Sequence, residues 1–105
     1  MNRDEAQRVA TNHLASYRAK PYAELVGLVG TVQTHQVVAP SGVTYQLEVQ
    51  AIWDDPKKPN DLLRVMVAVD DGGLRAFAPV TEAFLIGPYD VASNNRWPMS
   101  RAPAK

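Results

Sequence analysis

Apolar residues recur at helical spacing near the N-terminus and alternate with polar residues over most of the remaining chain. Asn2 stands three residues before Glu5, which is a capping-box arrangement with Asn in the Ser/Thr role. The apolar positions that follow recur every three or four residues and leave a polar opposite side. This pattern predicts a helix over about residues 3–19 that packs on a core through Ala6, Val9, Ala10, His13, Leu14 and Tyr17.

A shorter second helix is predicted directly after the first. Pro21 can be its first residue because the fixed φ of proline suits the first helical turn. Gly30 is placed to end it. Its apolar positions are Tyr22, Leu25, Val26 and Val29.

From residue 31 onward the period changes to the two-residue alternation that is typical of strands. Residues 31–39 predict a first strand, and Pro and Gly within 39–42 predict the turn into a second strand over 43–53. A polar loop with two prolines then leads to a third strand over 62–69. The rows expected to face the first helix are Tyr45, Leu47, Val49, Ala51 and Trp53, and Leu63, Val65, Val67 and Val69.

The end of the third strand carries a strong turn signal. An Asp-Gly pair at 71–72 predicts a tight type I′ hairpin, because that turn needs positive φ at both central residues. A short return strand over 74–78 would follow, and Pro79 would end it. Residues 80–86 are compatible with a strand or with a single helical turn that Thr81 opens.

These elements predict one α+β domain over residues 1–88. The N-terminal helix, with the short second helix, is expected to pack on one face of a four- to five-stranded antiparallel meander sheet. The length of 105 residues and the 46% hydrophobic and 21% charged content suit a single folded core. Residues 89–105 are rich in Asn, Ser, Pro and Arg and predict an extended or disordered tail.

Charge and composition disfavour several function classes. Lys+Arg and Asp+Glu number 11 each, so there is no basic excess to bind a phosphate backbone, and we expect no nucleic-acid partner. The chain has no cysteine, which excludes a disulfide framework and thiolate chemistry within it. The N-terminal residues are polar, and no apolar run approaches the ~18 residues of a membrane span, so a cytoplasmic protein without membrane contact is expected.

The chain contains no motif for nucleotide binding, zinc-protease or hydrolase chemistry. We therefore predict no catalytic residue, no cofactor and no metal site, and we favour a non-enzyme. The acidic pairs at 54–55 and 70–71 invite a paired-carboxylate hypothesis. They are expected at opposite ends of one hairpin, about 20 Å apart, and we interpret both as turn formers.

His13 lies near the middle of the apolar stripe of the first helix. An imidazole there must find a hydrogen-bond partner or lose its charge. The favoured interpretation is a satisfied, partly buried core histidine. The alternative is a pocket residue that has His35 or Glu48 as its partner, although His35 lies in a polar strand and is itself interpreted as a surface residue.

The second face of the sheet is a candidate surface for partner recognition. An antiparallel sheet often leaves such a face in water, but two apolar residues among the polar ones make it mildly adhesive. An exposed edge strand is the other candidate, and it would also allow a homodimer. The candidate face consists of Gln46, Glu48, Gln50, Ile52, Arg64 and Met66.

Three short motifs mark the sheet region, namely Trp53-Asp54-Asp55, Asp70-Asp71-Gly72-Gly73 and Phe77-Ala78-Pro79. With the strands around them they resemble a family of small, uncharacterised bacterial domains that share these three elements. The resemblance covers roughly residues 43–88 and excludes the tail. It implies a bacterial source, but the family has no known activity, so it implies no site residues.

Two functions from different classes remain. The first is a non-catalytic protein-interaction module, of an accessory, regulatory or immunity type, that acts through its sheet face or an edge strand. The second is a small-ligand-binding or enzymatic domain whose curved sheet and helix form a cone around a pocket near His13, as in cystatin-like and nuclear-transport-factor-like folds. A cavity of at least ~300 Å³ beside His13 would favour the second.

Overall fold

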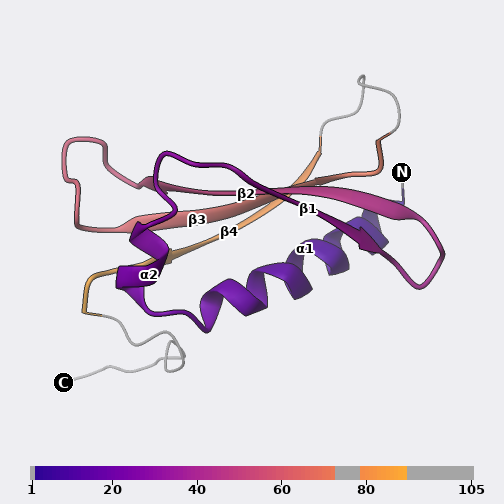
Figure 1. The fold of residues 1–105 in the computed structure, drawn as a ribbon, viewed down its shortest axis with the longest axis horizontal. Helices are drawn as coiled ribbons and strands as arrows, with labels where there is room; N and C mark the ends of the chain where they lie inside the picture. The colour runs from indigo at the N-terminus through magenta and orange to yellow at the C-terminus, as the bar shows by residue number, and fades with distance from the viewer. Residues whose placement is uncertain (1, 73–78, 90–105) are drawn as a thin grey trace.

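Residues 2–72 and 79–89 are described by the structure, a computed structural model, and they form two helices followed by four strands (Figure 1). The strands pair in chain order, each antiparallel to the next, as a four-stranded meander. The predicted α+β architecture is therefore confirmed. The elements are α1 (Arg3–Arg18), α2 (Tyr22–Val26), β1 (Gln33–Val38), β2 (Thr44–Trp53), β3 (Leu63–Asp70) and β4 (Val80–Ile86).

Helix α1 begins at the predicted cap. The side-chain oxygen of Asn2 accepts a hydrogen bond from the Glu5 N–H at 3.1 Å. The reciprocal half of the capping box does not form, because the Glu5 carboxylate turns toward the sheet and bonds Ser41 and Tyr45 instead. Neither helix of the described chain has the length and apolar character needed to cross a bilayer.

Helix α2 is shorter than predicted. It spans Tyr22–Val26, and Pro21 is its N-cap instead of its first helical residue. Val29, expected in the helix, forms an isolated parallel bridge with Ala51 and packs against the core. Gly30 follows with a φ of 89°, which turns the chain toward β1. Pairing with the sheet thus replaces the last predicted helical turn.

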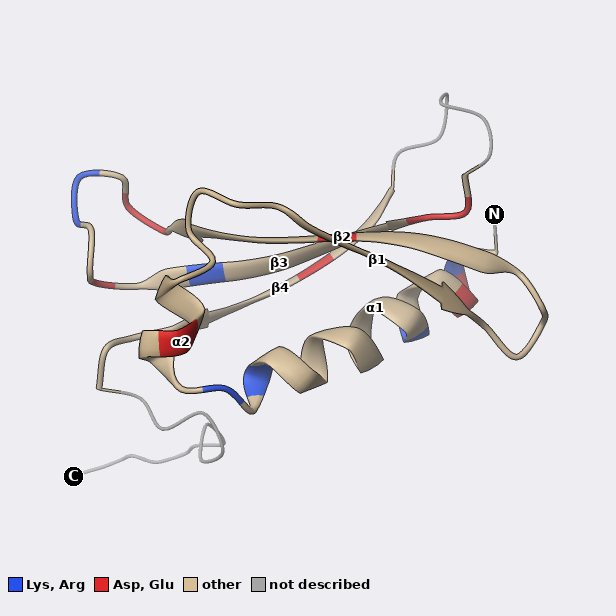
Figure 2. Cartoon of the chain, in the orientation of Figure 1, with Lys and Arg blue, Asp and Glu red and all other residues tan. Residues whose placement is uncertain are grey.

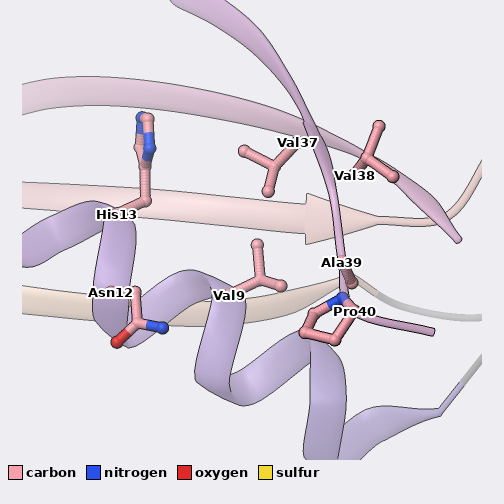
Figure 3. A pocket seen from close by; sticks show the side chains of 7 residues that line it. All are labelled: Val9, Asn12, His13, Val37, Val38, Ala39 and Pro40. Carbon is pink, nitrogen blue, oxygen red and sulfur yellow. The ribbon is translucent and has the colours of Figure 1, made fainter. Parts of the chain in front are cut away.

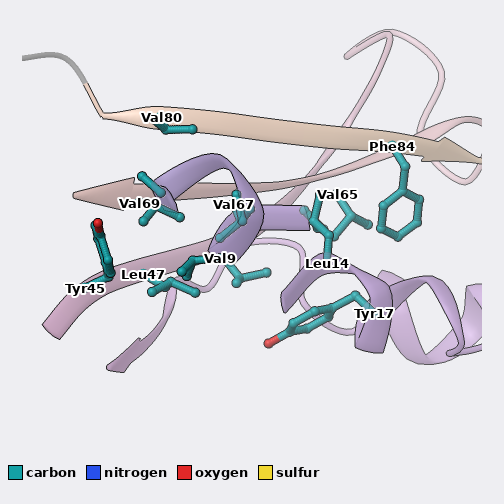
Figure 4. Close-up of a cluster of buried hydrophobic side chains, with 14 of the residues drawn as sticks. Val9, Leu14, Tyr17, Tyr45, Leu47, Val65, Val67, Val69, Val80 and Phe84 are labelled. Carbon is teal, nitrogen blue, oxygen red and sulfur yellow. The ribbon is translucent and has the colours of Figure 1, made fainter. Parts of the chain in front are cut away.

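The core lies between α1 and one face of the sheet (Figure 4). Helix α1 packs mainly over β3 and β4. Alternate residues of β2 and β3 point toward this layer, as the period-two pattern predicts, although Trp53 is only partly buried. The largest fully buried side chains are Leu14, Leu25, Tyr45, Leu47, Val49, Leu63, Val65, Val67 and Val69.

The connection between β3 and β4 is not the predicted tight hairpin. Val69 pairs with Val80, whereas a two-residue turn at 71–72 would pair Val69 with residue 74. The partner of β3 is therefore the 80–86 segment, which is a strand and not a helical turn. This pairing buries Val80, Phe84 and Ile86 in the core, and that burial outweighs a local turn preference.

The Asp-Gly signal still produces a local turn. The Asp70 carboxylate accepts a hydrogen bond from the Gly72 N–H at 2.7 Å, and Gly72 has a φ of 75°. The predicted strand over 74–78 lies outside the described residues, and so does the predicted tail from residue 90 onward.

Candidate functional site

Strand β1 is an edge of the sheet, and none of the described residues pairs with its outer side (Figure 1). Just beyond its end, the Ala39 N–H donates to the Val43 C=O at 2.9 Å. Backbone groups of an antiparallel strand point alternately to its two sides. Thr34, Gln36 and Val38 therefore direct their N–H and C=O groups away from β2, so three backbone donor–acceptor pairs lie along the outer side.

Strand β1 lacks the features by which edge strands usually avoid pairing. Such strands commonly carry a charge, a proline or a bulge, whereas the sequence QTHQVV of β1 contains no charged residue and no proline. Figure 2 shows β1 without Lys, Arg, Asp or Glu. Val32, directly before β1, and Val38, its last residue, are 53% and 69% exposed. This uncharged edge is suited to pairing with another chain.

A groove of about 250 Å³ lies between β1 and α1 (Figure 3). It exists because α1 packs mainly over β3 and β4 and leaves the β1 side of the sheet less covered. Its walls are mostly apolar, and its polar side chains come from two neighbouring residues of α1. The lining residues are Val9, Asn12, His13, Val37, Val38, Ala39 and Pro40.

His13 lies beside His35 of β1, with ring centroids 4.7 Å apart. The ring of Tyr17 is 5.6 Å from that of His13. The Tyr17 hydroxyl donates to the Gln33 side-chain oxygen at 3.1 Å and lies 3.2 Å from Nε2 of His35. Because the single hydroxyl proton goes to Gln33, the Tyr17 oxygen can accept from His35 in the tautomer that carries its proton on Nε2.

Nε2 of His13 is buried and has no hydrogen-bond partner. Burial, and secondly the neighbouring His35, hold the pKa of His13 below its ordinary value of 6.5. Burial also raises the pKa of the Tyr17 hydroxyl. The two imidazoles thus form a polar pair in which Nε2 of His13 has no partner, and burial favours the neutral form of the His13 ring.

A second hollow of about 170 Å³ lies on the other side of this pair, also between α1 and the start of β1. Tyr17 and Gln33 line it, so the His13–His35–Tyr17 cluster separates the two hollows. Lys20 and Glu24, which also line it, form an ion pair at 3.0 Å. The space between helix and edge strand therefore changes from apolar to polar along β1.

The predicted partner-binding face lies on the side of the sheet away from α1. Its six residues share one face because alternate residues of paired strands do so. Ile52 is 43% exposed, and Arg64 beside it forms an ion pair with Asp54. No described helix covers this face. Its residues are Gln46, Glu48, Gln50, Ile52, Arg64 and Met66.

The two acidic pairs form turns, as interpreted. The Asp55 carboxylate accepts from the Lys57 N–H at 2.9 Å, and the Asp70 carboxylate caps its own turn. The pairs lie at opposite ends of the β2–β3 ladder, where Trp53 pairs with Leu63 and Asp70 with Gln46. Among the described residues no three metal-ligating side chains gather.

His35 is placed differently from its prediction as a surface residue. It is half-buried and faces α1, because it pairs with the buried Leu47. Glu48, the other partner considered for His13, lies on the opposite face of the sheet. His35 lies two residues before the apolar Val37 in β1. Side chains two residues apart share one face of a strand, so this spacing could have placed His35 on the core side.

The buried carboxylate of Glu5 was not predicted. It accepts hydrogen bonds from Ser41 at 2.6 Å and from the Tyr45 hydroxyl at 2.9 Å. These partners lie 36 and 40 residues away in the chain, so no local pattern indicates them. The contact joins the first turn of α1 to the β1–β2 turn, next to the end of the groove.

No protein-family model, curated protein or solved structure matches this chain. The resemblance to small bacterial domains stays a prediction from its three motifs.

Proposed function

We propose that this protein is a non-catalytic interaction module that binds an extended segment of another protein as a fifth strand along the free edge of β1. The observation that carries the proposal is an uncharged edge strand beside an apolar groove. Strand addition gains affinity from main-chain hydrogen bonds and specificity from pockets for alternate side chains. Both components occur together at β1.

The groove suits the side chains of such a segment. A strand docked beside β1 places every second side chain on the α1 side, where Val9, Val37 and Pro40 form apolar walls. The groove volume of about 250 Å³ is below the ~300–1,000 Å³ of small-molecule sites. The size therefore favours side chains of a peptide over the small-ligand alternative near His13.

The edge is also favoured over the second face of the sheet. Outward backbone groups of Thr34, Gln36 and Val38 gain directed hydrogen bonds from a new strand. The mostly polar side chains of the second face are satisfied by water, which antiparallel sheets commonly leave on one side. Directed backbone groups therefore distinguish β1 as the docking element.

Proline at position 36 tests the proposal. The Gln36 N–H points away from β2, so Gln36→Pro removes an outward donor and leaves the β1–β2 ladder intact. We expect the circular dichroism spectrum to remain that of the folded protein. We expect peptides selected from a displayed library of random decapeptides to bind this variant about tenfold or more weakly, measured by fluorescence anisotropy.

Ala83→Pro is the matched control on the other edge. The Asp54 N–H donates to the Leu62 C=O at 2.9 Å, so Leu63 and every second residue after it direct their backbone groups toward β4. Val65 pairs with Phe84. The N–H of the neighbouring Ala83 therefore points outward from β4. Weakened binding in Gln36→Pro alone supports docking on β1. Equal binding of the peptide by the two variants contradicts docking on β1. Light scattering tests the other use of this edge, because a doubled mass would show that β1 pairs with a second copy of the chain.

A further inference from the structure

The His13–His35 pair lies where the second inward side chain of a docked strand would fall. Val37 and His35 both face α1, because they pair with the buried Tyr45 and Leu47. Side chains on one face of a strand recur every second residue, about 6.6 Å apart. A docked strand that places one side chain beside Val37 therefore places another beside His35.

No carboxylate among the described residues is hydrogen-bonded to either imidazole. The ionisable groups on the surrounding elements are engaged with other partners or lie on the opposite face or at the opposite edge of the sheet. Among them, Tyr17 is bonded to Gln33, Lys20 and Glu24 are paired with each other, and Glu5 is bonded to Tyr45 and lies near Arg8. Arg18 lies over the ring of Phe84, Glu48 lies on the opposite face of the sheet, and Glu82 is on the far edge strand β4.

We propose that the segment docked on β1 carries an aspartate or glutamate two residues from an apolar side chain. The carboxylate lies against the His13–His35 pair and the apolar side chain enters the groove beside Val37. This inference rests on the proposed strand addition. A carboxylate on the exposed side of these two half-buried rings can accept a hydrogen bond from an imidazole N–H, and its charge favours the protonated ring. The partner is thus an acidic and aliphatic β segment.

Binding of this carboxylate is coupled to proton uptake. In the free protein, burial and His35 keep the pKa of His13 below 6.5. A carboxylate at hydrogen-bond distance raises that pKa, so the complex holds a proton that the free protein lacks. Affinity therefore increases as pH falls between the two pKa values, until the carboxylate itself protonates near about pH 4.

Peptides selected at pH 6 from the random decapeptide library test the inference. We expect enriched sequences to carry an acidic residue two positions from Val, Ile or Leu. Their Kd, measured by fluorescence anisotropy, should be about three- to tenfold lower at pH 6 than at pH 8. Changing the acid of the peptide to its amide should remove this pH dependence, and this arm uses the unaltered protein.

Two protein variants test the same coupling from the other side. His13→Phe keeps an aromatic ring and removes one titrating imidazole of the pair, and we expect the affinity for the selected acidic peptide to depend less on pH than that of the unaltered protein. Asn12→Ala is the matched control, because Asn12 lines the same groove without titrating. It should change affinity without changing the pH dependence.

The outcomes separate this inference from the proposed function. Peptides that lose affinity for Gln36→Pro but show no acidic preference and no pH dependence would overturn the inference and leave strand addition standing. Peptides that bind Gln36→Pro and the unaltered protein equally would show that docking on β1 is itself wrong.

Discussion

A buried carboxylate joins the first turn of α1 to the β1–β2 hairpin. Glu5 is 7% exposed, and its hydrogen bonds from Ser41 and then Tyr45 lower its pKa. Burial and the same contact raise the pKa of the Tyr45 hydroxyl. Because folding favours the ionised carboxylate, Glu5 stabilises the fold above its unfolded pKa. This stabilisation is lost as pH falls through the lower pKa of the folded state.

Replacing Glu5 by Gln tests this assignment. We expect Glu5→Gln to lower the Tm by several degrees at pH 7, because the charged acceptor of two hydrogen bonds is lost. We also expect the variant to lose less stability than the unaltered protein between about pH 5 and pH 3. Thermal melts followed by circular dichroism provide the measurement.

Asp4→Asn is the control for this pH profile, because Asp4 is an exposed acid in the same helical turn. The stability of Asp4→Asn should change with pH in the same way as that of the unaltered protein. A Glu5→Gln profile that runs parallel to both would show that Glu5 does not carry the acid sensitivity.

At the scale of elements, the turn between β1 and β2 determines where the groove ends. The Gly42 N–H donates to the Ala39 C=O at 2.8 Å, and Gly42 has a φ of 91°. Ala39 and Pro40 line the groove, and Ser41 bonds Glu5. The backbone of this turn therefore positions both the groove and the buried carboxylate.

Substitution of Gly42 measures how much this turn depends on the left-handed conformation. An added Cβ meets no atom within 4 Å, so any cost comes from the backbone. We expect Gly42→Ala to reduce the free energy of unfolding by about 1–2 kcal/mol, and Gly42→Asn to reduce it less, because Asn tolerates positive φ. Urea unfolding measures both, and equal losses would contradict this explanation.

Element identities were easier to predict from sequence than their connections. The Asn2 cap, the turn at Gly42 and the alternating rows of β2 and β3 depend on neighbouring residues and were predicted correctly. The end of α2 and the partner of β3 were not, because the bridge of Val29 to the sheet and the burial of β4 outweigh local signals.

At the scale of the whole molecule, the position of α1 creates the candidate site. The helix covers mainly β3 and β4, so the β1 edge keeps a groove beside it. The sequence predicted the layers, the antiparallel meander and the core rows of β2 and β3. It did not predict that His13 meets His35, because that contact depends on where the helix crosses the sheet, which is decided by packing among residues distant in the chain.

Amide hydrogen exchange, measured by NMR with and without a selected peptide, tests the central claim most directly. In the free protein the amides of Thr34, Gln36 and Val38 should exchange rapidly, while His35 and Val37 are protected by their bonds to β2. Bound peptide should slow exchange at those three outward amides by about tenfold or more. Unchanged exchange there in the presence of saturating peptide would contradict strand addition at β1.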